Sequence, residues 1–236
     1  MFLNEDGAIE LSDEKVKLKP YKPRPFRNIE YMTDQEILDG KGGVLVFDTE
    51  NYKNYFLIAF KNIVTKKYLR LEIWKNNVFN ARLLSWILHN YRVVGFNSIK
   101  YDMSMIWLSY SNTHLGVDIK LETLFDLSQK LVLENLWPQQ AEKDYNFKIF
   151  PTDHIDLIEV APLKGSLKLY GARLHCSRLQ ELPFNIYTSL NEQEKEITAN
   201  YCFNDLDITE ELLIFMKERI ELRASMSAEY KINLMS

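Results

Sequence analysis

Four consecutive apolar residues, Val44-Leu45-Val46-Phe47, stand directly before a pair of acids in this chain. An unbroken apolar run of this length is typical of a central strand that other elements cover on both faces. Asp48 and Glu50 follow the run, and residues two apart on a strand project from the same face. The run therefore predicts a covered sheet, with two carboxylates side by side at the end of a buried strand.

The segments around this run alternate between strand-like and helix-like patterns. Strands are predicted at residues 55–60, 68–74, 92–96 and 154–158, and helices at 79–90, 101–110, 121–134, 166–174 and 191–224. Strands that come first and then mix with helices predict an α/β fold, in which helices flank a mixed sheet. With 236 residues, 46% of them hydrophobic, the chain is long enough to bury the core of one such domain.

The two ends of the chain differ from this predicted domain, which we place at residues 43–225. Residues 1–42 are expected to form a basic, proline-rich arm, because prolines alternate there with lysine and arginine and favour an extended path. The arm either lies solvated on the domain or forms a basic strip that tracks phosphates or docks on another domain. Residues 226–236 are expected to be a tail or the start of a linker.

A second group of polar residues follows the predicted strand at 92–96. Asn97 comes directly after this strand, and Asp102 opens the next predicted helix. Considered alone, Asp102 is a candidate N-terminal cap and partner of the helix dipole as much as a candidate site acid. Asn97 could likewise be a plain turn residue.

A third group lies on the predicted last helix. Tyr201 and Asp205 are four residues apart, so they share one face of that helix. An acid in the middle of a helix faces either solvent or a site. We expect Asp207 and Glu210 to lie on a solvated face, whereas Asp205 belongs to a larger pattern with the two groups above.

The chain thus carries three ordered motifs, Asp48-x-Glu50, Asn97-x-x-x-Tyr101-Asp102 and Tyr201-x-x-x-Asp205. They resemble the motifs of the DnaQ-like superfamily of proofreading 3′→5′ exonucleases. The resemblance covers residues 44–220 and implies a ribonuclease-H-like fold. It is to the branch with tyrosine near the last acid, because the other branch would need histidine where this chain has Asn200.

The resemblance also implies a set of metal ligands. Two divalent cations, Mg²⁺ or Mn²⁺, would bind the four acids, and two such ions can activate water and stabilise the leaving oxygen. Asp48 would bridge both ions, Glu50 and Asp205 would complete the shell of the first, and Asp102 would hold the second. Tyr201 would orient the attacking water or the scissile phosphate.

Contacts to the substrate follow from the same resemblance. Asn97 and Thr49 are expected to help hold the terminal nucleotide. Phe56 and Phe96 are candidate stacking surfaces for the terminal bases, although core packing is the role we favour for both rings.

By this resemblance the chain is expected to hydrolyse phosphodiester bonds at DNA 3′ ends, as a proofreading unit in DNA replication. Its partners would be a single-stranded or frayed 3′ end of DNA and a phage-type DNA polymerase domain, in cis or in trans. A 3′→5′ exoribonuclease of the same superfamily is an alternative, because discrimination rests on contacts to the 2′-hydroxyl. A non-catalytic module that binds nucleic acid or a replication protein is another, although it would be expected to lack one of the acids.

The composition also bears on several other classes of protein. A net charge of −4 is too small to indicate a dedicated duplex-binding protein, so nucleic-acid binding has to come from a local site. Cys176 and Cys202 cannot form a disulfide framework, and we interpret both as packing residues in a reducing compartment. The sequence shows neither a signal peptide nor a membrane span. We therefore expect a monomer in the cytoplasm of its cell or of a host.

Overall fold

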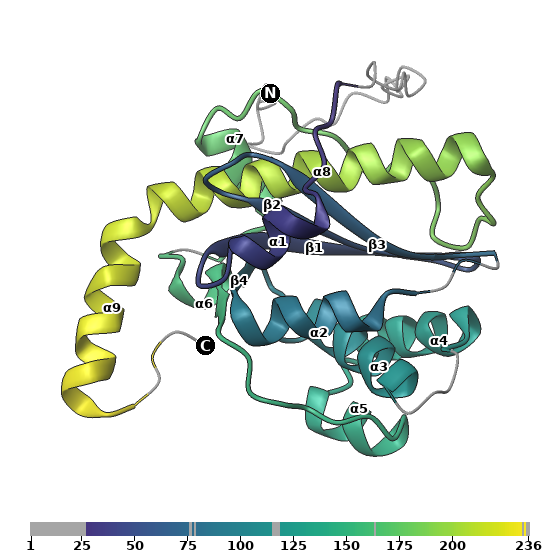
Figure 1. Cartoon of the computed structure of the whole chain (residues 1–236), viewed down its shortest axis with the longest axis horizontal. Helices are drawn as coiled ribbons and strands as arrows, with labels where there is room; N and C mark the ends of the chain where they lie inside the picture. The colour runs from purple at the N-terminus through teal and green to yellow at the C-terminus, as the bar shows by residue number, and fades with distance from the viewer. Residues whose placement is uncertain are drawn as a thin grey trace, which may run out of the picture.

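A five-stranded mixed sheet forms the centre of the protein (Figure 1). The computed structural model describes residues 27–75, 77, 79–114, 119–162, 164–232 and 234. The strands are β1 (Val44–Tyr52), β2 (Tyr55–Asn62), β3 (Tyr68–Trp74), β4 (Arg92–Gly95) and β5 (His154–Asp156). They lie in the order β3-β2-β1-β4-β5, with antiparallel pairing from β3 to β1 and parallel pairing from β1 to β5. This arrangement confirms the predicted α/β class and is compatible with a ribonuclease-H-like fold.

Helices cover both faces of the sheet, as the run at the start of β1 predicted. One face carries α7 (Leu167–Arg173) and α8 (Glu192–Phe215), and the other carries α2 (Ala81–Asn90), α3 (Asp102–His114), α4 (Leu121–Leu133) and α5 (Pro138–Asp144) (Figure 1). Alternate residues of β1 divide between the two cores. Leu45 and Phe47 pack on the side of α2 and α3, whereas Val46 packs with Phe203 of α8.

The central strand β1 is longer than its parallel neighbour β4, so the second part of β1 extends past the end of β4. β4 pairs with β1 only from Val44 to Val46, and after Gly95 the chain leaves the sheet. The later part of β1 therefore has no strand beside it on that edge among the described residues. Its backbone is available there to other partners, and the N-terminus of α3 supplies one.

The segment predicted as an arm holds a helix in its last part. Thr33 is the N-cap of α1 (Asp34–Asp39) and forms a capping box with Glu36, and Ile37 packs into the core. Residues 1–26, which include most of the expected basic strip, lie outside the described residues.

Two further elements differ from the sequence prediction. The last helix is not continuous, because it breaks at Met216 into α8 and α9 (Lys217–Tyr230). α9 has no fully buried residue, although Ile220 packs partly against the core, and the helix runs at an angle to α8 (Figure 1). β5 is also shorter than predicted, because Asp156 ends it by capping α6 (Leu157–Val160). No helix in the described ranges has both the length and the apolar character to cross a membrane.

Candidate active site

Asp48 and Glu50 lie on the face of β1 that α8 covers, in register with Val46. Candidate ligand atoms of these two acids and of Cys202 on α8 all lie within 4.8 Å of one another, so the three residues could hold a metal ion. Glu50 is buried, with 9% of its surface exposed. Burial raises the pKa of both carboxyls well above their usual range, and the other acids of the site raise it further.

Asp205 reaches the same place from α8. It is 6% exposed, and its Oδ1 atom has no hydrogen-bond partner among the described residues. Burial raises the pKa of Asp205 to about 6, although a hydrogen bond from Tyr201 and the charge of Lys168 oppose the rise. A buried carboxylate oxygen without a partner is costly, so its position indicates a ligand that the protein alone does not provide.

Asp102 arrives from the opposite side of the sheet, at the first residue of α3. Its Oδ1 accepts hydrogen bonds from the backbone N–H of Thr49, at 3.1 Å, and from the Thr49 hydroxyl, at 2.5 Å. These bonds use the part of β1 that β4 leaves uncovered. Burial raises the pKa of Asp102 to about 7 even though the bonds from Thr49 lower it. Thr49, expected at the substrate, has its hydroxyl engaged in holding Asp102.

The four carboxylates therefore converge from three elements and act on one another electrostatically. The pKa of Asp48 is raised first by burial and then by Asp102, Glu50 and Asp205. Carboxyl groups that lie close together in a buried place resist ionisation, which raises their pKa values. A bound cation lowers these pKa values because it favours the ionised carboxylates. The cluster thus has the electrostatic character of a cation site.

Cys202 is fully buried in the core between the sheet and α8, as expected of a packing residue, and it also lies beside the acids. Its Sγ lies 3.8 Å from Oδ2 of Asp48, within the acidic cluster. Burial, and then the charges of Asp48 and Glu50, raise the pKa of the thiol well above its usual value. The thiol therefore stays protonated and acts as a weak hydrogen-bond donor to Asp48.

Tyr201 stands beside the acids with Lys168 of α7, a residue that the sequence analysis did not identify. Lys168 Nζ donates a hydrogen bond of 2.8 Å to the Tyr201 hydroxyl and lies 4.9 Å from the centre of its ring. Burial, then the charges of Asp205 and Glu50, raise the pKa of Tyr201 far above its usual value, so the phenol stays protonated. Lys168 reaches Tyr201 because α7 packs against α8.

Asn97 lies in a loop that Asp156 holds in shape. The carboxylate of Asp156 accepts hydrogen bonds from the backbone N–H groups of Asn97, at 2.7 Å, and of Ile99, at 2.9 Å. Asn97 is exposed and has a left-handed backbone, with φ of 56°, a conformation that asparagine tolerates better than most residues. Asp156 is 1% exposed, and its carboxylate supports both this loop and the N-terminus of α6.

The two candidate stacking rings differ in their accessibility. Phe56 is fully buried at 0% exposure and belongs to the core beneath the sheet, so its ring is not available to a base. Phe96 is half-buried and makes an edge-to-face contact with Tyr170, with ring centres 5.9 Å apart. Phe56 is therefore a core-packing residue. Phe96 packs at the edge of the core between the sheet and α8.

The expectation of a solvated face at Asp207 and Glu210 is wrong, because both acids form an ion-pair network. Lys61 Nζ lies 2.7 Å from Asp207 Oδ1 and 2.5 Å from Glu210 Oε2. Arg27 also pairs with Asp207, and Lys66 with Glu210. The network joins β2, α8 and the start of the described chain, so its acids serve the fold.

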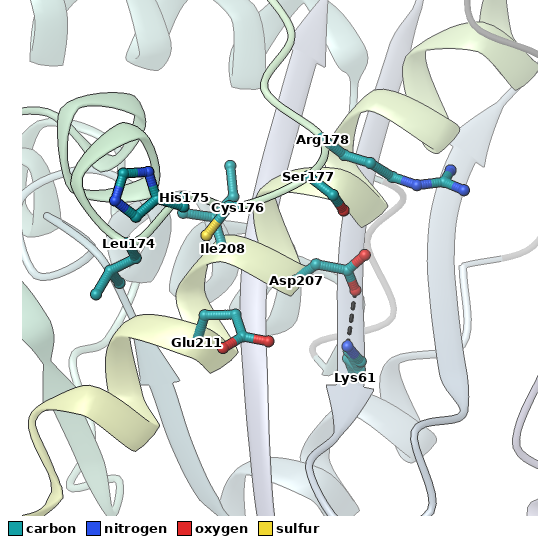
Figure 2. Close-up of a pocket in the computed structure, with 9 residues that line it drawn as sticks. All are labelled: Lys61, Leu174, His175, Cys176, Ser177, Arg178, Asp207, Ile208 and Glu211. Carbon is teal, nitrogen blue, oxygen red and sulfur yellow. Dashed lines mark hydrogen bonds and ion pairs between the residues drawn. The ribbon is translucent and has the colours of Figure 1, made fainter.

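A cavity of about 450 Å³ lies between α8 and the loop after α7 (Figure 2). Its wall includes Lys61 and Asp207, which pair with each other, and Glu211 and Cys176. Burial and the nearby acids Glu211 and Asp207 raise the pKa of the Cys176 thiol, which disfavours the reactive thiolate. The cavity wall thus offers little chemistry compared with the acidic cluster.

Comparisons of the chain with protein-family models, with curated proteins and with solved structures gave no match.

Proposed function

We propose that this protein is a metal-dependent 3′→5′ exonuclease that hydrolyses phosphodiester bonds at DNA ends. The observation that carries the proposal is the convergence of four carboxylates from β1, α3 and α8 at one buried point beside Tyr201. Their identity and order along the chain resemble the motifs of proofreading exonucleases, which supports the choice of reaction.

The residues present fit divalent cations of the hard type. The donor set is oxygen from carboxylates, which Mg²⁺ and Mn²⁺ prefer, and Cys202 is a protonated thiol that suits neither ion. The buried Oδ1 of Asp205 has no hydrogen-bond partner in the described part of the chain, so it could coordinate a cation. Asp48, Glu50, Asp102 and Asp205 would hold two ions, which supply activated water and stabilise charge on the oxygens of the phosphate.

The protein's own groups have distinct parts in this reaction. Thr49 holds Asp102 against β1, so the carboxylates from the two sides of the sheet keep a fixed separation. Tyr201 remains a phenol and can donate its proton in a hydrogen bond to a phosphate oxygen or to the attacking water. It orients these groups and does not act as a base, because its pKa is raised.

The substrate that we propose is the single-stranded or frayed 3′ end of DNA, presented by a polymerase domain in cis or in trans. A terminal nucleotide would approach past the exposed Asn97 loop, whose backbone Asp156 fixes. A base must be unpaired to enter such a site, so a frayed end should react faster than a paired one by an amount that reflects a few kcal/mol of unpairing.

The test uses oligonucleotides labelled at one end and incubated with Mg²⁺ or Mn²⁺. We expect mononucleotides to leave from the 3′ end of DNA, and Asp205→Asn to lower the rate by orders of magnitude. Glu211→Gln, an exposed acid on the same helix, is the matched control and should change little. Release from the 5′ end, cleavage of closed circles or full activity in excess chelator would contradict the proposal. Faster cleavage of an RNA strand of the same sequence would instead support the alternative assignment as a 3′→5′ exoribonuclease.

A further inference from the structure

We infer that Lys168 is a positioning residue, which fixes the direction of the Tyr201 hydroxyl so that its proton faces the substrate phosphate. This inference rests on the proposed function and adds a residue from α7 that lies outside the three motifs. It stands on the contact of 2.8 Å between Lys168 Nζ and the Tyr201 hydroxyl.

The chemistry of the two groups determines which of them donates. A lysine ammonium has only donors, so the Tyr201 oxygen has to accept the hydrogen bond. The phenol's own proton then points toward another acceptor. The acceptors on that side are the carboxylate of Asp205 and, when substrate is bound, a phosphate oxygen. Without Lys168 the hydroxyl could rotate among several partners.

The backbone of Lys168 is held independently of this contact. The Ser166 side chain caps α7 by accepting from the Leu169 N–H at 3.2 Å. Gly171 brings α7 close to α8, because a Cβ atom there would lie 2.9 Å from Ile208 Cγ2. Lys168 is therefore presented to α8 by a fixed helix, and its side chain is not required to hold that helix in place.

Other partners of Lys168 are weaker. Its Nζ lies 3.7 Å from Glu181 Oε2, but the Glu181 side chain is 89% exposed, where ion pairs contribute little. The Lys168 side chain is itself 28% exposed. Replacing Lys168 should consequently change stability mainly through the loss of its positive charge beside Asp205 and Glu50, and Lys168→Arg keeps that charge.

The experiment is a double-mutant cycle between Lys168→Met and Tyr201→Phe, measured as the rate of release of the 3′ nucleotide. Each single change should lower kcat/KM about 10- to 100-fold, the range of one lost hydrogen bond to a charged group. The double variant should be no slower than Tyr201→Phe, because Lys168 acts through the hydroxyl. Lys168→Arg, which keeps a donor, should recover part of the rate. Lys164→Met, an exposed lysine just before α7, is the control.

A second readout does not require catalysis. Binding of thymidine monophosphate in the presence of Ca²⁺ should weaken by the same factor in both single variants and no further in the double variant. If the wild type binds the nucleotide in this way but cleaves no DNA, the exonuclease proposal fails and the positioning role stands. If the wild type cleaves DNA and Lys168→Met behaves like Lys164→Met, the positioning role fails alone. Additive losses in the cycle would also overturn it, and a wild type that neither binds nor cleaves would overturn both.

Discussion

Replacing Asp48 by Asn should stabilise the protein in chelator and destabilise it, relative to wild type, in Mn²⁺. The reason for the first effect is the repulsion among the buried acids. Ligand atoms of Asp48 and Glu50 lie within 4.8 Å of each other. Two unit charges at that distance repel by about 3 kcal/mol at an effective dielectric constant of about 20.

Only part of this repulsion is present in the folded protein. Burial and the neighbouring acids raise the pKa values of Asp48 and Glu50, which opposes full ionisation of the pair. We therefore expect the free energy of unfolding of Asp48→Asn in chelator to exceed that of wild type by about 1–2 kcal/mol. For a chain of this size, each kcal/mol shifts the melting temperature by about 2–4 °C.

Added Mn²⁺ should reverse the order of the two proteins. A ligand at about one hundred times its dissociation constant stabilises the folded state by about 2.7 kcal/mol. Wild type should gain this stabilisation, and Asp48→Asn should lose most of it because one of the carboxylates proposed to hold the cation is gone. Calorimetric melting in EDTA and in Mn²⁺ measures both effects, with Glu211→Gln as the control. A lower melting temperature for Asp48→Asn in EDTA would refute the repulsion argument, and no response of wild type to Mn²⁺ would refute the cation site.

Three further outcomes are expected. Tyr201→Phe should lose about 10- to 100-fold in cleavage rate, with metal affinity from calorimetric titration unchanged, and a loss of metal binding would assign Tyr201 a structural part. Burial lowers the pKa of His154 to about 4, so its contribution to stability is present above its unfolded pKa, near 6.5, and is lost as the pH falls toward 4. Wild type should thus lose up to about 3 kcal/mol more than His154→Gln across that window in urea unfolding, and parallel curves would show that His154 does not titrate this way. Gly171→Ala should cost about 1–3 kcal/mol, because the new Cβ would lie 2.9 Å from Cγ2 of the β-branched Ile208 on α8, and an unchanged melting temperature would mean that α7 can shift freely.

The sheet and the places of the acids were accessible to sequence reasoning because they follow local rules. The apolar run of β1 shows that both faces are covered, and the alternation along a strand places Asp48 and Glu50 together on one of them. The four-residue spacing of Tyr201 and Asp205 likewise fixes their common face on α8. These features need no knowledge of the tertiary contacts.

What sequence reasoning missed depends on contacts between distant segments. Lys168 and Cys202 reach the acids only because α7 packs on α8 and α8 on β1, and neither residue has a local signal. Asp207 and Glu210 were misassigned for the same reason, since their partner Lys61 comes from β2. The break at Met216 was hidden because helical spacing continues through it, while burial stops there.

The bonds from Asp156 to the Asn97 loop have a consequence for how such a site can change over many generations or be transplanted. The loop is held by the carboxylate of Asp156, which is 59 positions away from Asn97 in the chain. Asp156 lies at the end of β5, the strand that pairs with β4. Residues 97–101 therefore cannot be transferred to another protein on their own. If they were grafted onto another sheet, the backbone amides of Asn97 and Ile99 would lose their acceptor. Substitutions in the loop and at Asp156 should accordingly be epistatic. A variant acceptable in the loop would become harmful, or the reverse, according to which residue stands at the end of β5.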